Sequence, residues 1–200
     1  RYKPNVLFAF GPHAVYTVSK KSLEWMRDFS EKEDILIHMH LDETENEVVF
    51  CRDKYGLTPV EFLDSVGLIS DRYIGCHACM LDENGCRIVK RKRGNLVHVP
   101  VSNLKLAVDR IFPHLLVKKH TIPYCFGTDG CASNNHLDII ETMKFASLLA
   151  KYSTHDPTML PAQETLENAT RTAAGIFRLG SWEIQVGNSP DIILIDTQRP

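Results

Sequence analysis

Several features that mark other classes of protein are missing from this 200-residue sequence. No apolar run approaches the ~20 residues that a membrane-spanning helix needs, and we expect no secretory leader. The formal net charge is only −2, which gives no electrostatic reason to expect nucleic acid or an anionic membrane as a partner. We therefore expect a soluble cytoplasmic protein with neither partner. Because the first residue is Arg1 rather than Met, we expect the native chain to begin further upstream.

The cysteines are not expected to form a disulfide framework. They are spread through apparent core and loop positions, at 51, 76, 79, 86, 125 and 131. This spread favours reduced thiols in a cytoplasmic enzyme. Cys76, His77 and Cys79, with Cys86, are also compatible with a zinc knuckle, but no second ligand pair follows at a finger-like spacing.

Strand-like and helix-like segments alternate, without repeats or low-complexity linkers. Apolar runs predict strands at 5–10, 34–41, 72–76, 96–99 and 122–126. Periodicity and capping residues predict helices at 19–30, 44–55, 58–66, 82–92, 108–117, after 135, and at 162–177. Five strand–helix units predict a parallel sheet covered by helices. The pattern alone leaves a doubly wound sheet and a barrel open, although no Gly-rich phosphate loop follows the first strand.

Two predicted helices begin with a capping box. Thr44 is followed three residues later by Glu47, and Thr58 by Glu61. Pro59 occupies the first helical position of the second box, where its missing N–H costs nothing.

Chemistry-bearing side chains gather where predicted strands end. His13, His40, Glu43, His77 and Asp129 lie at or just past the carboxyl ends of four separate strands. Because the carboxyl ends of parallel strands meet at one face, this placement is typical of a barrel enzyme.

A carboxylate at the position of Asp129, at the tip of a buried strand, loses hydration free energy unless a metal, a cation or several donors compensate for the loss. The alternative is a plain turn in which Asp129 bonds nearby N–H groups. His38 and His40 share one face of their strand. His40, nearer the carboxyl end, is the better ligand candidate, and His38 is expected to be a hydrogen-bonded interior residue; both are alternatively core histidines.

Other candidates depend more on context. An imidazole at the position of His77 suits polarising a carbonyl or steadying a water, but a buried histidine bonded to a backbone carbonyl explains it equally well. Glu43, three residues past His40, is placed to face a substrate, and His13 to reach over the same mouth.

Four motifs together resemble the amidohydrolase superfamily. They are Gly-Pro-His at 11–13, His-Leu-Asp-Glu-Thr at 40–44, Ser-Asn-Leu-Lys-Leu at 102–106, and Gly-Thr-Asp-Gly-Cys-Ala-Ser-Asn-Asn at 127–135. The closest resemblance is to the branch of methylthioadenosine/S-adenosylhomocysteine deaminases and chlorohydrolase-like, cytosine deaminase-related enzymes. It implies an α/β fold, with residues 1–179 forming about strands four to eight of a (β/α)8 TIM-type barrel. Residues 180–200, with Gly-Asn-Ser-Pro-Asp at 187–191, would be the return strands of a small β-sandwich domain.

The resemblance also implies a metal site. His40 and Asp129 would be ligands of one divalent ion, expected to be zinc with iron as the alternative. The family's first two ligands, a His-x-His pair on the first barrel strand, do not occur here, so we expect this piece alone to be inactive. The Glu-Thr after His40 assigns the His38–His40 pair to a later strand.

The implied reaction is hydrolytic deamination of a purine-type, adenosine thioether-like substrate, and the resemblance also suggests a homodimer. Asp129 would accept a proton from the attacking water, His77 would orient the reacting centre, and Glu43 would carry a proton to the ring nitrogen. His13, Glu43 and Ser133 would contact the substrate.

Some residues depart from the family pattern: Val15, Val99 and Pro190 replace the usual Pro, Asn and Ala. These changes bear on substrate preference and local packing. The alternatives are a non-catalytic binding module of the same fold, or a guanine or cytosine deaminase or triazine chlorohydrolase-like enzyme.

Overall fold

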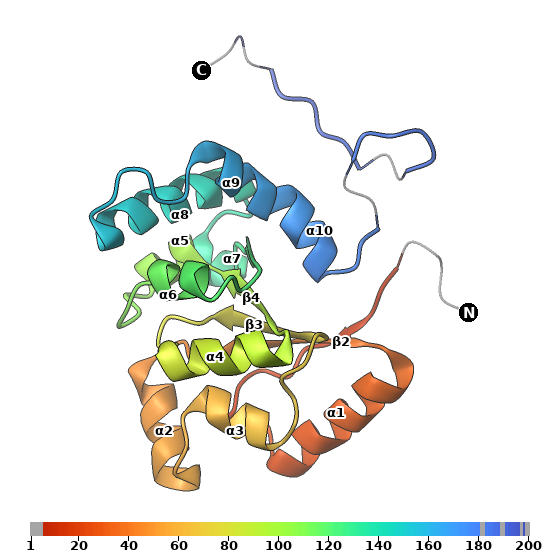
Figure 1. Ribbon diagram of the computed structural model, residues 1–200, viewed down its shortest axis with the longest axis vertical. Coiled ribbons are helices and arrows are strands. Elements are labelled where there is room, and N and C mark those ends of the chain that lie inside the picture. The colour runs from red at the N-terminus through yellow and green to blue at the C-terminus, as the bar shows by residue number, and fades with distance from the viewer. Residues whose placement is uncertain (1–5, 181–182, 189–190, 197, 199–200) are drawn as a thin grey trace.

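A single parallel sheet organises the protein (Figure 1). The computed structural model describes residues 6–180, 183–188, 191–196 and 198. The strands are β1 (Ala9–Phe10), β2 (Leu36–Leu41), β3 (Tyr73–His77), β4 (Asn95–His98) and β5 (Tyr124–Phe126). They lie in the order β1-β2-β3-β4-β5, and every neighbouring pair is parallel. A doubly wound sheet reverses its strand order part-way, so this consecutive order favours the barrel-type architecture.

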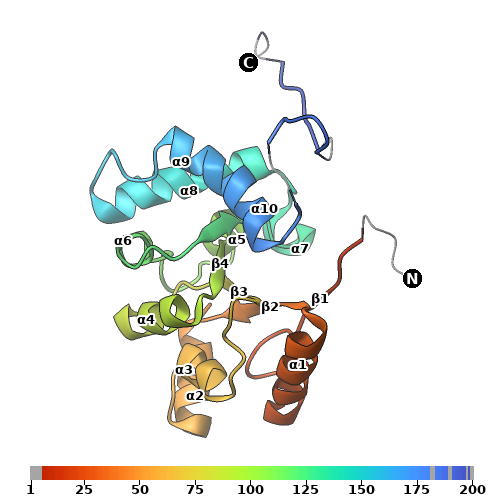
Figure 2. The same cartoon turned by 45° about the vertical axis from the view of Figure 1, so that its right-hand side comes forward.

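Helices follow the strands in alternation. They are α1 (Lys20–Glu33), α2 (Glu45–Tyr55), α3 (Pro59–Ser65), α4 (Glu83–Lys92), α5 (Pro100–Lys105), α6 (His114–Lys119), α7 (Cys131–Asn134), α8 (Ile139–Thr154), α9 (Ala162–Glu167) and α10 (Ala173–Ile176), with a π-helical turn Asn168–Thr172 between the last two. In Figures 1 and 2, α1–α4 gather on one side of the strands and α8–α10 lie beyond the other end.

One predicted helix starts later than expected. Residues 108–113 of the predicted helix 108–117 are not helical; α6 starts only at His114, and an additional helix, α5, starts directly after β4. The physical reason is Pro113, because a proline disfavours the helical conformation of the residue before it, here Phe112.

The two faces of the sheet have different partners. The helix-facing side contributes Ile37, Met39, Leu41, Tyr73 and Leu96 to the main core, which includes Leu23, Leu63 and Val89 from the helices. The opposite, inner side contributes Leu36, Ile74, Cys76, Val97 and Cys125 to a second cluster. Ile176 of α10 completes the second cluster, so α10 covers part of the inner face.

The two capping boxes turn out differently. At the start of α3, the Thr58 and Glu61 side chains accept from each other's backbone N–H, as predicted. At the start of α2, Thr44 accepts from the Glu47 N–H, but the Glu47 carboxylate accepts from the N–H of Glu43 at 2.8 Å. Glu47 thus supports the loop that carries Glu43, a predicted site residue.

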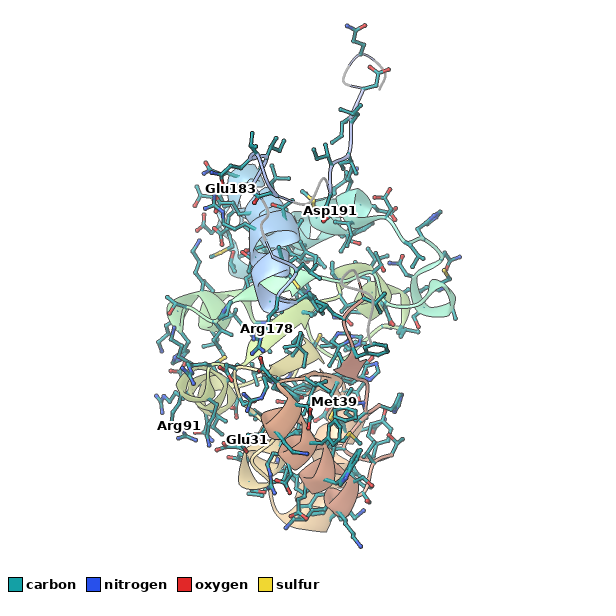
Figure 3. The ribbon with its side chains drawn as sticks, turned by 90° about the vertical axis from the view of Figure 1, so that its right-hand side faces the viewer. Glu31, Met39, Arg91, Arg178, Glu183 and Asp191 are labelled. Atoms are coloured by element: carbon teal, nitrogen blue, oxygen red, sulfur yellow. The ribbon has the colours of Figure 1, made fainter. Side chains whose placement is uncertain are left out.

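Beyond α10 the chain leaves the packed helices (Figure 1). Arg178, labelled in Figure 3, pairs with Asp34 at 2.7 Å and so links this end of the chain to the end of α1. The described stretches that carry Glu183 and Asp191 form a turn and irregular backbone, without strand. A strand requires a partner strand, so the small β-domain at 180–200 stays a prediction. Within the described ranges, no helix has the length and apolar character needed to cross a bilayer.

Candidate active site

A cavity of about 290 Å³ opens at the carboxyl ends of the strands. Its wall includes the predicted site residues His13, His40, His77 and Asp129, together with His38, Cys76, Val97 and Val99. The residues come from the loop after β1, from β2, from β3, from β4 and from the loop after β5. The structure therefore brings together side chains that are more than a hundred residues apart in the sequence.

His40 is oriented by the loop after β1. Its Nδ1 lies 2.6 Å from the carbonyl oxygen of His13. Since a carbonyl only accepts, Nδ1 carries the proton and Nε2 keeps the lone pair that a metal ligand needs. The His40 ring also stacks on that of His77, with centroids 5.2 Å apart.

His38, on the same strand face as His40, is hydrogen-bonded, as expected. Its Nε2 lies 2.7 Å from Cys76 Sγ, but the side chain is exposed in this chain rather than interior. Partial desolvation at the cavity wall nevertheless lowers the pKa of His38, and the neighbouring His40 and His77 lower it further.

His77 reaches the cavity through an unusual backbone turn. In β3 its neighbour Cys76 belongs to the inner face, so simple alternation directs His77 to the helix side. However, His77 has φ of 71°, and the N–H of Ala78 bonds the carbonyl of Cys76 at 3.0 Å. This tight three-residue turn with positive φ is rare and strained for a non-glycine residue. It turns the imidazole from the helix side toward the cavity, which His77 lines.

Glu43 lies beside this imidazole. Its Oε1 is 3.8 Å from Nδ1 of His77. Ligand atoms of His40, Glu43 and His77 all lie within 4.8 Å of one another, close enough for the three side chains to share a metal ion. Beneath the loop, burial raises the pKa of Glu47 to about 7, with the Glu43 carboxylate adding to the shift and backbone donors opposing it.

Asp129 is held by donors on both oxygens. Ser102 Oγ donates to Oδ2 at 2.6 Å, and the N–H of Gly130 donates to Oδ1 at 2.7 Å. Burial alone would raise the pKa of this carboxyl, but these donors and the nearby His77 and His40 outweigh it and lower the pKa. Asp129 is therefore a carboxylate at neutral pH, with lone pairs left on each oxygen.

This donor set fits a divalent cation of the zinc class. Imidazole nitrogens and carboxylate oxygens are the ligands that zinc accepts. His40 offers Nε2, and Asp129 and Glu43 offer oxygens at the same cavity or beside it. Asp129 is not part of the tight three-residue group.

Ser133 has a less direct position than the other candidates. It lies in α7, where its N–H bonds the carbonyl of Gly130 at 3.0 Å, and it is half-buried. It is not among the residues that line the cavity, so its contact with substrate stays a prediction.

Sequence reasoning missed two residues that touch the site groups. Ser102 contacts Asp129, and Asn103 Oδ1 lies 2.7 Å from Nδ1 of His77. Both sit in the first turn of α5, directly after β4. The available signal was their polar character at a strand's carboxyl end, in a motif to which no role had been assigned.

These features define a barrel-type α/β protein with a histidine–carboxylate site at the carboxyl ends of its strands. The chain belongs to the amidohydrolase family, which it matches over residues 2–200. The predicted family and fold are thereby confirmed.

Two curated relatives are similar over nearly the whole chain. It is 43% identical over 192 residues to a 5'-deoxyadenosine deaminase of Methanospirillum hungatei, and covers 43% of that protein. It is 40% identical over 198 residues to 5-methylthioadenosine/S-adenosylhomocysteine deaminase 1 of Archaeoglobus fulgidus, and covers 47% of it. The chain thus spans less than half the length of these relatives.

Solved structures agree. An adenosine deaminase from Xanthomonas campestris with bound zinc superposes with a TM-score of 0.91 at 37% identity, covering 96% of this chain and 44% of that one. The atrazine chlorohydrolase of Arthrobacter aurescens, complexed with zinc, gives 0.77 at 25% identity and covers 84% and 37%.

Proposed function

We propose that the protein containing this chain is a metal-dependent aminohydrolase that deaminates a purine-type, adenosine thioether-like substrate with water. The observation that best supports this proposal is that His40, His77 and an ionised Asp129 line one cavity, with Glu43 beside them. The deaminase names of the relatives support the substrate class.

His40 and Asp129 would hold one divalent ion, with zinc as the proposed identity because zinc is bound in two similar structures. Such an ion supplies Lewis acidity that lowers the pKa of water toward neutrality. The two ligands fall short of the usual four in this chain, so the proposal requires further ligands from the rest of the protein.

The side chains divide the proton transfers. Asp129, kept ionised by Ser102 and Gly130, accepts the proton of the water that attacks the amine-bearing carbon. Glu43 delivers a proton to the ring nitrogen. The amine then leaves as ammonia with the proton that Asp129 took from the water, and the proton of the new C–OH group returns to Glu43. His77 orients the reacting centre, while His13 and Ser133 contact the rest of the substrate.

Ammonia release by the full-length protein tests this proposal. We expect turnover of 5'-deoxyadenosine or 5-methylthioadenosine above that of guanine, cytosine and a chlorinated triazine. Turnover of the triazine instead would indicate a chlorohydrolase-like enzyme, and turnover of none would support a non-catalytic binding module. A homodimer and a cytoplasmic location are further parts of the proposal, tested by light scattering and cell fractionation.

A further inference from the structure

We propose that Asn103 and Cys79 are positioning residues that set the tautomer of His77, keeping the proton on Nδ1 and the lone pair on Nε2. The inference rests on the proposed function for its catalytic meaning, since it concerns how the same site is kept ready. Its structural basis is a small buried ring of contacts that joins His77, in the cavity wall, to Asn103 and Cys79, which do not line the cavity.

Three contacts close that ring. Asn103 Oδ1 lies 2.7 Å from His77 Nδ1, and Asn103 Nδ2 donates to Cys79 Sγ at 3.0 Å. The thiol of Cys79 lies 3.6 Å from the carbonyl oxygen of His77 and donates to it. All three residues are buried, with exposed fractions of 2% for His77, 7% for Asn103 and 2% for Cys79.

The chemistry of the amide decides where the imidazole proton lies. An amide oxygen only accepts and an amide nitrogen only donates. With the thiol proton directed to the His77 carbonyl, the sulfur lone pairs accept from Asn103 Nδ2, and Oδ1 is left facing the imidazole. Oδ1 then requires an N–H from Nδ1.

Glu43 supports the same assignment independently. Its Oε1 lies 3.8 Å from Nδ1 of His77. A carboxylate is attracted by an N–H and repelled by a lone pair at that position. In water, by contrast, neutral imidazole favours the proton on Nε2. Asn103 and Glu43 therefore both stabilise the tautomer of His77 that is less populated in water.

The ring also explains how the strained turn persists. His77 and the next residue, Ala78, both have positive φ, at 71° and 51°. Such conformations persist where the surroundings over-determine them. Asn103 bonds the ring of His77 and, through Cys79, its backbone carbonyl, so one side chain restrains both ends of the residue.

The same turn of α5 restrains Asp129 through Ser102. Two consecutive residues therefore position two groups of the proposed reaction: Ser102 positions Asp129, the base, and Asn103 positions His77, which orients the reacting centre. Nε2 of His77 is the nitrogen left to meet water or substrate, because Nδ1 is occupied.

Histidine ring NMR on the intact protein, with zinc present and again after its removal, tests the proposal. Long-range 1H–15N correlations identify the protonated nitrogen, and loss of signals in His77→Gln assigns them. We expect wild-type His77 to be protonated on Nδ1 when neutral, and Asn103→Ala to move a measurable share of that population to Nε2, because Glu43 alone still favours Nδ1. Asn84→Ala, which removes an exposed asparagine bonded to Glu61, is the matched control and should change nothing.

Two conservative variants separate positioning from general packing. Asn103→Asp should keep the wild-type tautomer, because a carboxylate can only accept from Nδ1, and Cys79→Ser should keep it because a hydroxyl replaces both thiol contacts. Cys79→Ala should give a mixture, and this variant also answers the question if Asn103→Ala does not fold. In kinetics, Asn103→Ala should lower kcat about tenfold or more with KM little changed.

Protonation of wild-type His77 on Nε2, or an unchanged tautomer in both alanine variants, would overturn the inference. The NMR result does not depend on turnover. An inactive protein with the expected tautomers would contradict the proposed function alone, whereas an active deaminase without them would contradict only the positioning role.

Discussion

The hydroxyl of Ser102 donates a hydrogen bond to Asp129 Oδ2 at 2.6 Å, although the two residues follow different strands. The serine is fully buried and the aspartate has a positive φ of 62°. A hydrogen bond to a charged group contributes about 1.5–3 kcal/mol, so this contact helps keep the carboxylate both ionised and aimed.

Removing the hydroxyl should therefore weaken the site. We expect Ser102→Ala to lower kcat/KM by about 10- to 100-fold, the equivalent of that hydrogen bond, and to move the acidic limb of the pH–rate profile upward. Ser153→Ala, in which an exposed serine of α8 loses a bond to its own helix, should leave both unchanged. An unaltered profile in Ser102→Ala would show that the bond does not tune Asp129.

Asp129→Asn should remove nearly all turnover while leaving the fold intact. Asparagine tolerates positive φ and keeps the shape of the side chain, but the amide cannot accept a proton. The expected loss in kcat is on the order of 10²–10⁴, with substrate binding, measured by calorimetry, changed much less. Near-wild-type kcat in a metal-loaded variant would contradict the assignment of Asp129 as the base.

Two buried histidines should make stability depend on pH. Burial lowers the pKa of His114 to about 4, and burial, with His114 and His77 nearby, lowers that of His98 well below its usual value. The rings of His98 and His114 lie 5.0 Å apart. Between an unfolded-state pKa of about 6.5 and these lower values, the unfolded chain binds more protons, so stability falls as the pH decreases from about 7 to about 4.

Urea unfolding of the intact protein at pH 7 and pH 5 measures this effect. His114 alone should contribute a loss of about 2 kcal/mol over that interval, and His114→Gln should reduce the loss. His136→Gln, at an exposed position, is the control. Equal pH dependence in wild type and His114→Gln would rule out His114 as a source.

The 200-residue piece expressed alone should be inactive and should self-associate. β1 forms an edge of the sheet, and Leu7, Phe8 and Trp25 near it are 62%, 58% and 57% exposed. Unpaired strand edges with exposed apolar side chains invite association. Light scattering with a zinc titration and a deamination assay checks this; robust turnover by a monomer would show that His38 and His40 form the primary metal pair.

Much of the fold was readable in the sequence because its signals are local. Capping residues such as Ser19 and Thr58 set helix starts within a residue, and strand alternation placed His38 and His40 on one face. Pro113 was an equally local signal, and overlooking it placed the start of the helix predicted at 108–117 too early. The resemblance in the ordered motifs then identified the family.

Tertiary structure alone decided how the site is assembled. Alternation directs His77 away from the cavity, and only the positive φ at its position returns it. Its hydrogen-bonding partner, Asn103, is 26 residues away, and that of Asp129, Ser102, is 27 residues away. Local sequence determines which conformations each segment prefers; which buried polar groups meet depends on the register of neighbouring strands and on the requirement that each buried donor and acceptor find a partner.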